Sequence, residues 1–191
     1  MIKKSLIKKN IIKNLTQSIL DNLIVDLDLK LHTNINLILD FNNLLSKSFL
    51  VKKANILIVK NAHKKETIFF TFKEGQFNLH ISNHFIENTY LIRVLSVMIH
   101  EYVHYLQILT YKSVEFGYEK YFYNSIEFAN IYKKNKYEKE AYKIQYYITN
   151  YIYYLILKET YRNRNFEVIK NKVLELKGKD KYRYNWFREI N

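Results

Sequence analysis

The alternation of hydrophobic and polar positions predicts helices in the first fifty residues. In residues 2–23, apolar side chains recur every three or four positions, the spacing of one buried face of an α-helix. These side chains are Ile2, Leu6, Ile7, Ile11, Leu15, Ile19 and Leu23. Residues 34–50 contain similarly spaced apolar clusters, so we expect a second helix there.

Three short runs in the next part of the chain predict strands. Residues 55–59 are apolar and rich in β-branched side chains, and residues 67–72 and 77–82 have a similar composition. The last two runs are separated by only four residues, which include Gly75, and this favours a hairpin. We therefore expect a small antiparallel sheet within about residues 55–82.

Helical spacing returns from about residue 88. Residues 90–109 and 137–157 each predict a long helix, with a possible break at Gly117 and a loop at 133–136. The last thirty residues are basic, and one more helix is expected around 166–176. The expected architecture is therefore a mostly helical α+β fold whose sheet packs near the helix of residues 90–109. Without an internal repeat or a Gly/Ser/Pro linker, it forms a single domain, 1–191, with N-terminal helices (1–50) and a basic C-terminal tail (162–191).

Composition narrows the possible chemistry. The 191-residue chain has no cysteine, so a disulfide framework and a thiolate metal site are both excluded. The formal net charge of +13 permits a nucleic-acid or anionic-surface partner, although no run of Lys and Arg exceeds two residues. We find neither a secretory signal nor a transmembrane segment, and we expect a soluble intracellular protein. Organellar targeting stays open as an alternative.

The sequence His100-Glu101-Tyr102-Val103-His104 lies inside the predicted helix of residues 90–109. Residues four apart share one face of a helix, so the two histidines can offer ring nitrogens to one metal ion. Glu101 lies beside them and can take a proton from a metal-bound water. The alternative is a pair of histidines that hydrogen-bond to the abundant tyrosine hydroxyls.

A catalytic zinc ion needs a third protein ligand. No histidine follows His104, and Gln107 and Thr110 replace the glycine and the histidine of the longer H-E-x-x-H-x-x-G-x-x-H motif. Asp180, the only later aspartate, falls in the basic tail, so we expect a glutamate from a later helix. The downstream glutamates are Glu115, Glu119, Glu127, Glu138, Glu140, Glu159, Glu167, Glu175 and Glu189.

Residues 67–150 resemble the gluzincins, a group of zincin metallopeptidases, in particular their small phage and bacterial members. Glu138 and Ala141 have the spacing of the E-x-x-A/S-D element that supplies the third ligand of that family, although Tyr142 stands where an Asp is frequent. The resemblance implies a Zn²⁺ cofactor held by His100, His104 and Glu138, with Glu140 as the alternative ligand. It also implies hydrolysis of a peptide or protein substrate by Glu101 acting on zinc-bound water.

The same resemblance suggests where the substrate and further site residues lie. Zincins pair the substrate with an edge strand, for which residues 77–82 are the candidate, with His80 and His84 within or beside it. A tyrosine or histidine usually stabilises the oxyanion in this family. The candidates for that role, or for supporting a ligand, are Tyr142, Tyr146 and Gln107. The rival functions are a basic helical protein that binds nucleic acid or an anionic surface, and a catalytically inactive zincin.

Overall fold

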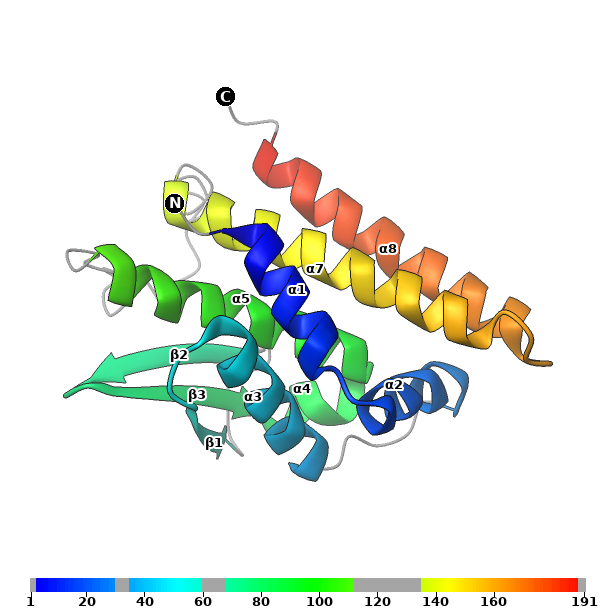
Figure 1. Ribbon diagram of the computed structural model, residues 1–191, viewed down its shortest axis with the longest axis horizontal. Coiled ribbons are helices and arrows are strands. Elements are labelled where there is room, and N and C mark those ends of the chain that lie inside the picture. Colours follow the sequence, from blue (N-terminus) through cyan, green and yellow to red (C-terminus); the bar gives the residue numbers. More distant parts are fainter. Residues whose placement is uncertain (1–2, 30–34, 60–67, 112–134, 189–191) are drawn as a thin grey trace.

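A computed structural model describes residues 3–29, 35–59, 68–111 and 135–188 (Figure 1). Its helices are α1 (Lys4–Asn14), α2 (Gln17–Leu29), α3 (Ile35–Phe49), α4 (Asn83–Asn88), α5 (Leu91–Tyr111), α7 (Lys136–Thr160) and α8 (Phe166–Arg188). Its strands are β1 (Asn55–Val59), β2 (Ile68–Lys73) and β3 (Gln76–Ser82). The structure is mostly helical with one small sheet, which confirms the predicted α+β class.

Helix α5 lies at the centre of the described structure. It packs against α7, α3 and β2, and in Figure 1 it runs between the sheet and α7, with α8 on the far side of α7. Its apolar side chains are buried around the whole helix: Leu91, Ile92, Val94, Leu95, Met98, Ile99 and Val103. A helix that is apolar all round is stable only when other elements surround it, so the neighbours of α5 follow from its sequence.

A buried carboxylate from another helix caps the N-terminus of α5. Asp26 of α2 is fully buried, and its Oδ2 accepts a hydrogen bond of 2.7 Å from the backbone N–H of Leu91. The first amides of a helix have no partner within the helix, and the helix dipole favours a negative charge at this end. Asp26 therefore supplies a hydrogen-bond acceptor for a first-turn amide and a negative charge at the positive end of the helix dipole, and it fixes where α5 begins.

The single helix predicted for residues 2–23 is wrong, because α1 ends at Asn14 and α2 begins at Gln17. Leu15 has an extended backbone conformation, and the Thr16 hydroxyl accepts a hydrogen bond from the N–H of Ile19. Threonine is a favoured N-cap, so Thr16 starts a new helix within a continuous apolar pattern. The helix predicted for residues 34–50 is confirmed as α3.

The sheet has the strand order β1-β3-β2. The predicted hairpin is confirmed: β2 and β3 are antiparallel and are joined by Glu74 and Gly75, whose φ angles of 52° and 75° suit a two-residue turn. The prediction of an entirely antiparallel sheet is wrong, since β1 pairs with β3 in parallel. The alternation of side chains determines which face of a strand is buried, but not the direction in which the strand runs.

Helix α8 is longer than expected. The prediction covered only residues around 166–176, yet the helix continues to Arg188. Its buried positions Ile169, Val173 and Leu176 are followed on the same face by Asp180, which pairs with Arg93 of α5 and accepts a 3.0 Å hydrogen bond from the Tyr153 hydroxyl.

Other predictions meet the structure in part. The short helix α4 was not predicted, while the long helices predicted for residues 90–109 and 137–157 are confirmed as α5 and α7. Gly117 and residues 133–134 of the predicted 133–136 loop lie outside the described residues, while Asn135 is the N-cap of α7 and Lys136 is its first residue. None of the helices described has an apolar stretch long enough to cross a bilayer.

The buried pair of Arg93 and Asp180 should dominate the attachment of α8. We expect Asp180→Ala to lower the free energy of unfolding by about 3–5 kcal/mol, because it leaves a buried guanidinium without its carboxylate. The double variant Arg93→Met/Asp180→Leu should lose much less, since it removes both charges. Urea unfolding followed by circular dichroism measures the effect, with the exposed Asp21→Ala as control. Equal midpoints for Asp180→Ala and the native protein would contradict it.

Candidate metal centre

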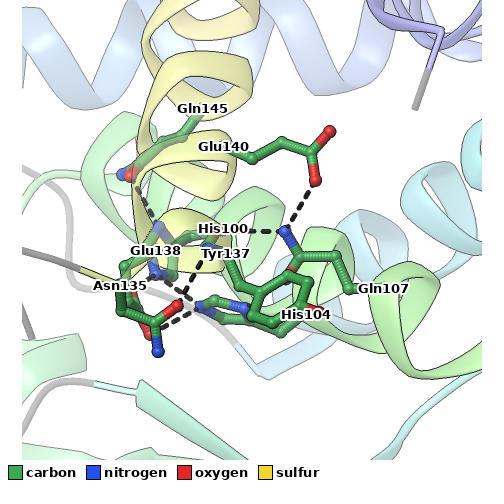
Figure 2. A network of polar contacts seen from close by, with 8 residues as sticks. All are labelled: His100, His104, Gln107, Asn135, Tyr137, Glu138, Glu140 and Gln145. Atoms are coloured by element: carbon green, nitrogen blue, oxygen red, sulfur yellow. Dashed lines mark hydrogen bonds and ion pairs between the residues drawn. The ribbon is translucent and has the colours of Figure 1, made fainter. Parts of the chain in front are cut away.

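Two histidines from α5 and one glutamate from α7 meet in the buried contact between these helices (Figure 2). His100 and His104 lie one turn apart on the face of α5 that packs against α7. Glu138 is the third residue of α7. The N-cap of this helix is Asn135, whose side chain accepts a hydrogen bond of 2.8 Å from the N–H of Tyr137. The positive end of the helix dipole favours a carboxylate at this point.

The polar atoms of the three side chains converge on one point. The two histidine Nε2 atoms are 3.0 Å apart, and each is 3.2 Å from an oxygen of Glu138. All three side chains are buried, with exposed fractions of 5% for His100, 2% for His104 and 1% for Glu138. The contact joins residues 38 positions apart in the chain, so it depends on the packing of α5 against α7.

This arrangement fits the donor set of a metal ion. Two neutral imidazole nitrogens and one carboxylate oxygen are ligands that Zn²⁺ accepts, with a further position left for a non-protein ligand. A tetrahedral ion with bonds of about 2.0–2.1 Å holds its ligand atoms roughly 3.4 Å apart. The observed separations of 3.0 and 3.2 Å are close to that value. His100, His104 and Glu138 are therefore the residues that could hold an ion.

The other ring nitrogen of each histidine faces a glutamine. His104 Nδ1 lies 2.8 Å from Oε1 of Gln107, one turn further along α5, and His100 Nδ1 lies 3.2 Å from Oε1 of Gln145 on α7. Gln107 was expected near the site, and the structure places it against the candidate ligand His104. Gln145 was missed; it lies two turns after Glu138 on the same face of α7, which was the only available signal.

Aromatic side chains enclose the two imidazoles. The ring of Phe70, from β2, stacks on His104 with centroids 5.7 Å apart, and the ring of Tyr142 meets His100 edge-on at 4.4 Å. Tyr142 therefore lies at the site, as expected, and it contacts the ring of a histidine. Tyr146 is half-buried one turn further along α7, and its role stays a prediction.

Burial and charge act in opposite directions on the three candidate ligands. Burial lowers the pKa of His104, but the nearby Glu138 carboxylate outweighs burial and raises that pKa to about 9. Burial alone would raise the pKa of Glu138, yet the two histidines lower it to about 2. The pKa of His100 is lowered, mainly by burial. Without a metal ion, a proton on His104 thus balances the charge of Glu138.

Glu101 is positioned differently from the ligands. It is buried on α5 next to His100, and burial raises the pKa of its carboxyl group to about 8, with Glu138 adding to the effect and His104 opposing it. Within the described part of the chain, no group donates a hydrogen bond to its carboxylate. Its oxygens are therefore available to a water molecule or a substrate.

Several candidates from the sequence do not join this cluster. Glu140, the alternative third ligand, accepts a 3.0 Å hydrogen bond from Gln107, and Asp180 pairs with Arg93. His80 lies 3.0 Å from the Thr71 hydroxyl and stacks on Phe69, while His84 contacts Asn88.

The expected edge strand, residues 77–82, is wrong because β3 is the central strand and pairs on both sides. Its side chains Phe77, Leu79 and Ile81 are buried on one face of the sheet, a pattern that an edge strand and a central strand share. Within the described structure β2 is an edge strand of the sheet, and it carries Phe70 against His104.

Comparisons with family models, with curated proteins and with solved structures gave no match to this chain. Its function therefore has to be argued from the site.

Removal of any one ligand should abolish tight metal binding. We expect the native protein to bind one equivalent of Zn²⁺ and His100→Ala, His104→Ala and Glu138→Ala to bind it more than about 100-fold more weakly, a larger loss than a supporting residue gives. Competition with a chromophoric chelator measures the affinity. Glu140→Gln should keep stoichiometric zinc, and the exposed Glu159→Gln on the same helix is the matched control. Zinc lost with Glu140→Gln but kept with Glu138→Ala would reverse the assignment.

Metal binding should release protons at neutral pH. His104, with a pKa of about 9 in the metal-free protein, is protonated at pH 7, and an ion must displace that proton to bind Nε2. We expect release of about one proton from His104 and a further fraction from Glu101, and a zinc affinity that rises with pH up to about 9. Titration calorimetry at pH 7 in buffers with different ionisation enthalpies measures this number. An observed enthalpy that is independent of the buffer would contradict the expectation.

Proposed function

We propose that the protein is a zinc-dependent metallopeptidase of the zincin type. The supporting observation is that Glu138, from a separate helix, meets both histidines of the His100-Glu101-Tyr102-Val103-His104 sequence. The helical spacing accounts for two histidines on one face. Two histidines that only pack in a core would not be expected to share a buried carboxylate. Here Glu138, a ligand of the type found in gluzincins, contacts both rings.

The donor set favours zinc over other common ions. Imidazole nitrogen is a poor ligand for Mg²⁺ and Ca²⁺, which prefer oxygen, and the absence of thiolates disfavours Cu⁺ and iron–sulfur clusters. Two imidazoles and one carboxylate are a known ligand set of catalytic zinc in peptidases. When bound, Zn²⁺ supplies Lewis acidity, which polarises a carbonyl group and acidifies water.

The residues of the chain then have distinct tasks. Glu101 follows His100 directly, so its carboxylate lies beside the ligands without being one of them, and it accepts the proton of the attacking water. The same group can hand this proton to the leaving amine. Its buried position, where no described group hydrogen-bonds it, suits a proton carrier. A positive ion nearby would lower its pKa from about 8 towards the working range of a base.

The substrate is a peptide or protein, held by β2. This strand lies at the edge of the sheet and contacts α5, and its residue Phe70 stacks on His104. An extended peptide can add to an edge strand through backbone hydrogen bonds, which would bring its scissile carbonyl towards the histidines. Tyr142, whose ring meets His100, is the best-placed candidate to support the oxyanion.

The positive charge does not favour the rival function. On α8 three lysines are paired with glutamates of the same helix: Lys170 with Glu167, and Lys172 and Lys179 with Glu175. Part of the basic character of the tail is therefore neutralised locally. Binding to nucleic acid or to an anionic surface stays an open expectation, and it is compatible with peptidase activity.

Glu101→Gln separates catalysis from metal binding. We expect this variant to bind one equivalent of zinc and to hydrolyse peptides about 10²–10⁴-fold more slowly, because the amide cannot accept a proton. Cleavage of a mixed peptide library, followed by mass spectrometry, measures activity without a known substrate. The matched control is Glu159→Gln, an exposed position on α7. Native protein that binds zinc yet cleaves no more than Glu101→Gln would instead support an inactive zincin.

A further inference from the structure

Two buried glutamine side chains contact the metal-site histidines from behind. Gln107 is fully buried and Gln145 is 9% exposed. Each directs its carbonyl oxygen at the Nδ1 atom of one histidine, while the Nε2 atoms of both histidines point towards Glu138 (Figure 2). Neither glutamine contributes an atom to the group that could hold an ion. Their role must therefore act through the histidines.

The surroundings of Gln107 determine which way its amide is turned. Its Nε2 lies 3.0 Å from the backbone carbonyl oxygen of Tyr137 and 3.0 Å from a carboxylate oxygen of Glu140. Both are acceptors, so the donor end of the amide must face them. The carbonyl end then faces His104 Nδ1 at 2.8 Å, and that nitrogen must carry the hydrogen. The lone pair of a neutral His104 is consequently on Nε2, where the ion would bind.

Gln145 is placed in a similar way on the other histidine, although its Nε2 faces a hydroxyl group rather than two groups that only accept. Its Nε2 lies 2.9 Å from the hydroxyl of Ser96, which also bonds to Thr149 at 3.0 Å, and its Oε1 faces His100 Nδ1. A histidine that binds an ion through Nε2 keeps its proton on Nδ1, and this proton needs an acceptor when it is buried. Oε1 of Gln145 is placed to accept it.

We propose that Gln107 and Gln145 are positioning residues that hold His104 and His100 in the Nδ1–H form with Nε2 facing the ion. Gln107 has a second effect, because it binds residues on both sides of Glu138 and so fixes the first turn of α7 against α5. One side chain thereby aligns two ligands from different helices. The proposal rests on the proposed metal site and extends it to the groups that orient the ligands.

Both partners are uncharged, which has a chemical consequence. A carboxylate in this position would pull the Nδ1 proton and add a negative charge beside the ion. An amide oxygen accepts the same hydrogen bond but adds no charge. Among the described residues, Glu138 is then the single anionic ligand of the ion, and the remaining positive charge is available to Glu101 and to a polarised carbonyl group.

Zinc affinity tests the proposal without any need for peptidase activity. We expect Gln107→Leu and Gln145→Leu to bind Zn²⁺ about 10–100-fold more weakly than the native protein. The matched control is Thr160→Val, which removes a fully buried hydroxyl that bonds to the backbone carbonyl of Ile156 near the end of α7 but to neither histidine, and which should keep the native affinity. Affinities of both glutamine variants within twofold of the native value would overturn the proposal.

If a leucine variant does not fold, a pair of variants that moves the carboxylate from position 140 to position 107 tests the same contact. Gln107→Glu keeps an acceptor for His104 Nδ1 but places a carboxylate against Glu140, so we expect weaker zinc binding. Adding Glu140→Gln restores a donor at that contact and should recover most of the lost affinity. A double variant that binds zinc no better than Gln107→Glu alone would overturn the role given to Gln107.

Nitrogen-15 NMR of the zinc-loaded protein reads the ring form directly. In the native protein we expect zinc on Nε2 and a slowly exchanging hydrogen on Nδ1 of both histidines, and in each leucine variant faster exchange of the corresponding hydrogen. Zinc on Nδ1 of either ring would overturn the proposal. Native protein that binds no zinc would overturn the proposed function itself, whereas native protein that binds zinc but cleaves no peptide leaves the positioning role intact.

Discussion

One buried contact constrains how α5 and α7 pack: the carboxylate of Glu138 faces the Nε2 atoms of His100 and His104. An isolated carboxylate at 1% exposure would be strongly unfavourable, because burial removes the water that stabilises its charge. In the metal-free protein, a proton on His104 supplies the opposite charge, and the raised pKa of His104 and the lowered pKa of Glu138 express the same attraction. A divalent cation would balance the charge of Glu138 more strongly than this proton does.

This contact requires α5 and α7 to meet in one register, and polar groups distant from the site help to set it. Asp26 caps the first turn of α5, and Asp180 of α8 binds Arg93 of α5 and Tyr153 of α7. At the middle of α5 the Tyr102 hydroxyl bonds to Asn42 of α3 and accepts from the N–H of Ala54, just before β1. Since apolar packing alone tolerates small shifts, these directional contacts give α5 a defined position.

The sequence predicted the parts of the site that depend on local geometry. The two histidines lie four apart in a helix, so their shared face follows from the helical period. The prediction of Glu138 needed more than helical spacing. It rested on the absence of a later histidine and on the resemblance of the residues around Glu138 to a known element. The structure brings it to both rings, while Glu140, two residues later, points to Gln107.

What the sequence did not predict depends on contacts between distant residues. Gln145 supports His100 only because α5 and α7 pack in a particular register, and no spacing within α7 reveals that register. The parallel pairing of β1 and the central position of β3 are likewise properties of the assembled sheet. The end of α1 was missed for a different reason: the apolar spacing continues through Leu15, and only the capping hydroxyl of Thr16 marks the break.

The composition of the core bears on why the polar cluster exists at all. The apolar core of the described structure extends through α1, α2, α3, the sheet, α5, α7 and α8, and its side chains do not need the cluster to be buried. In small zinc-stabilised domains the ion replaces a missing core, but here the core is extensive. Replacing buried charged groups with apolar side chains of similar volume is often neutral or stabilising. Two histidines, two glutamates and two glutamines buried at one helix contact, with strongly shifted pKa values among them, mark this contact as a candidate functional site.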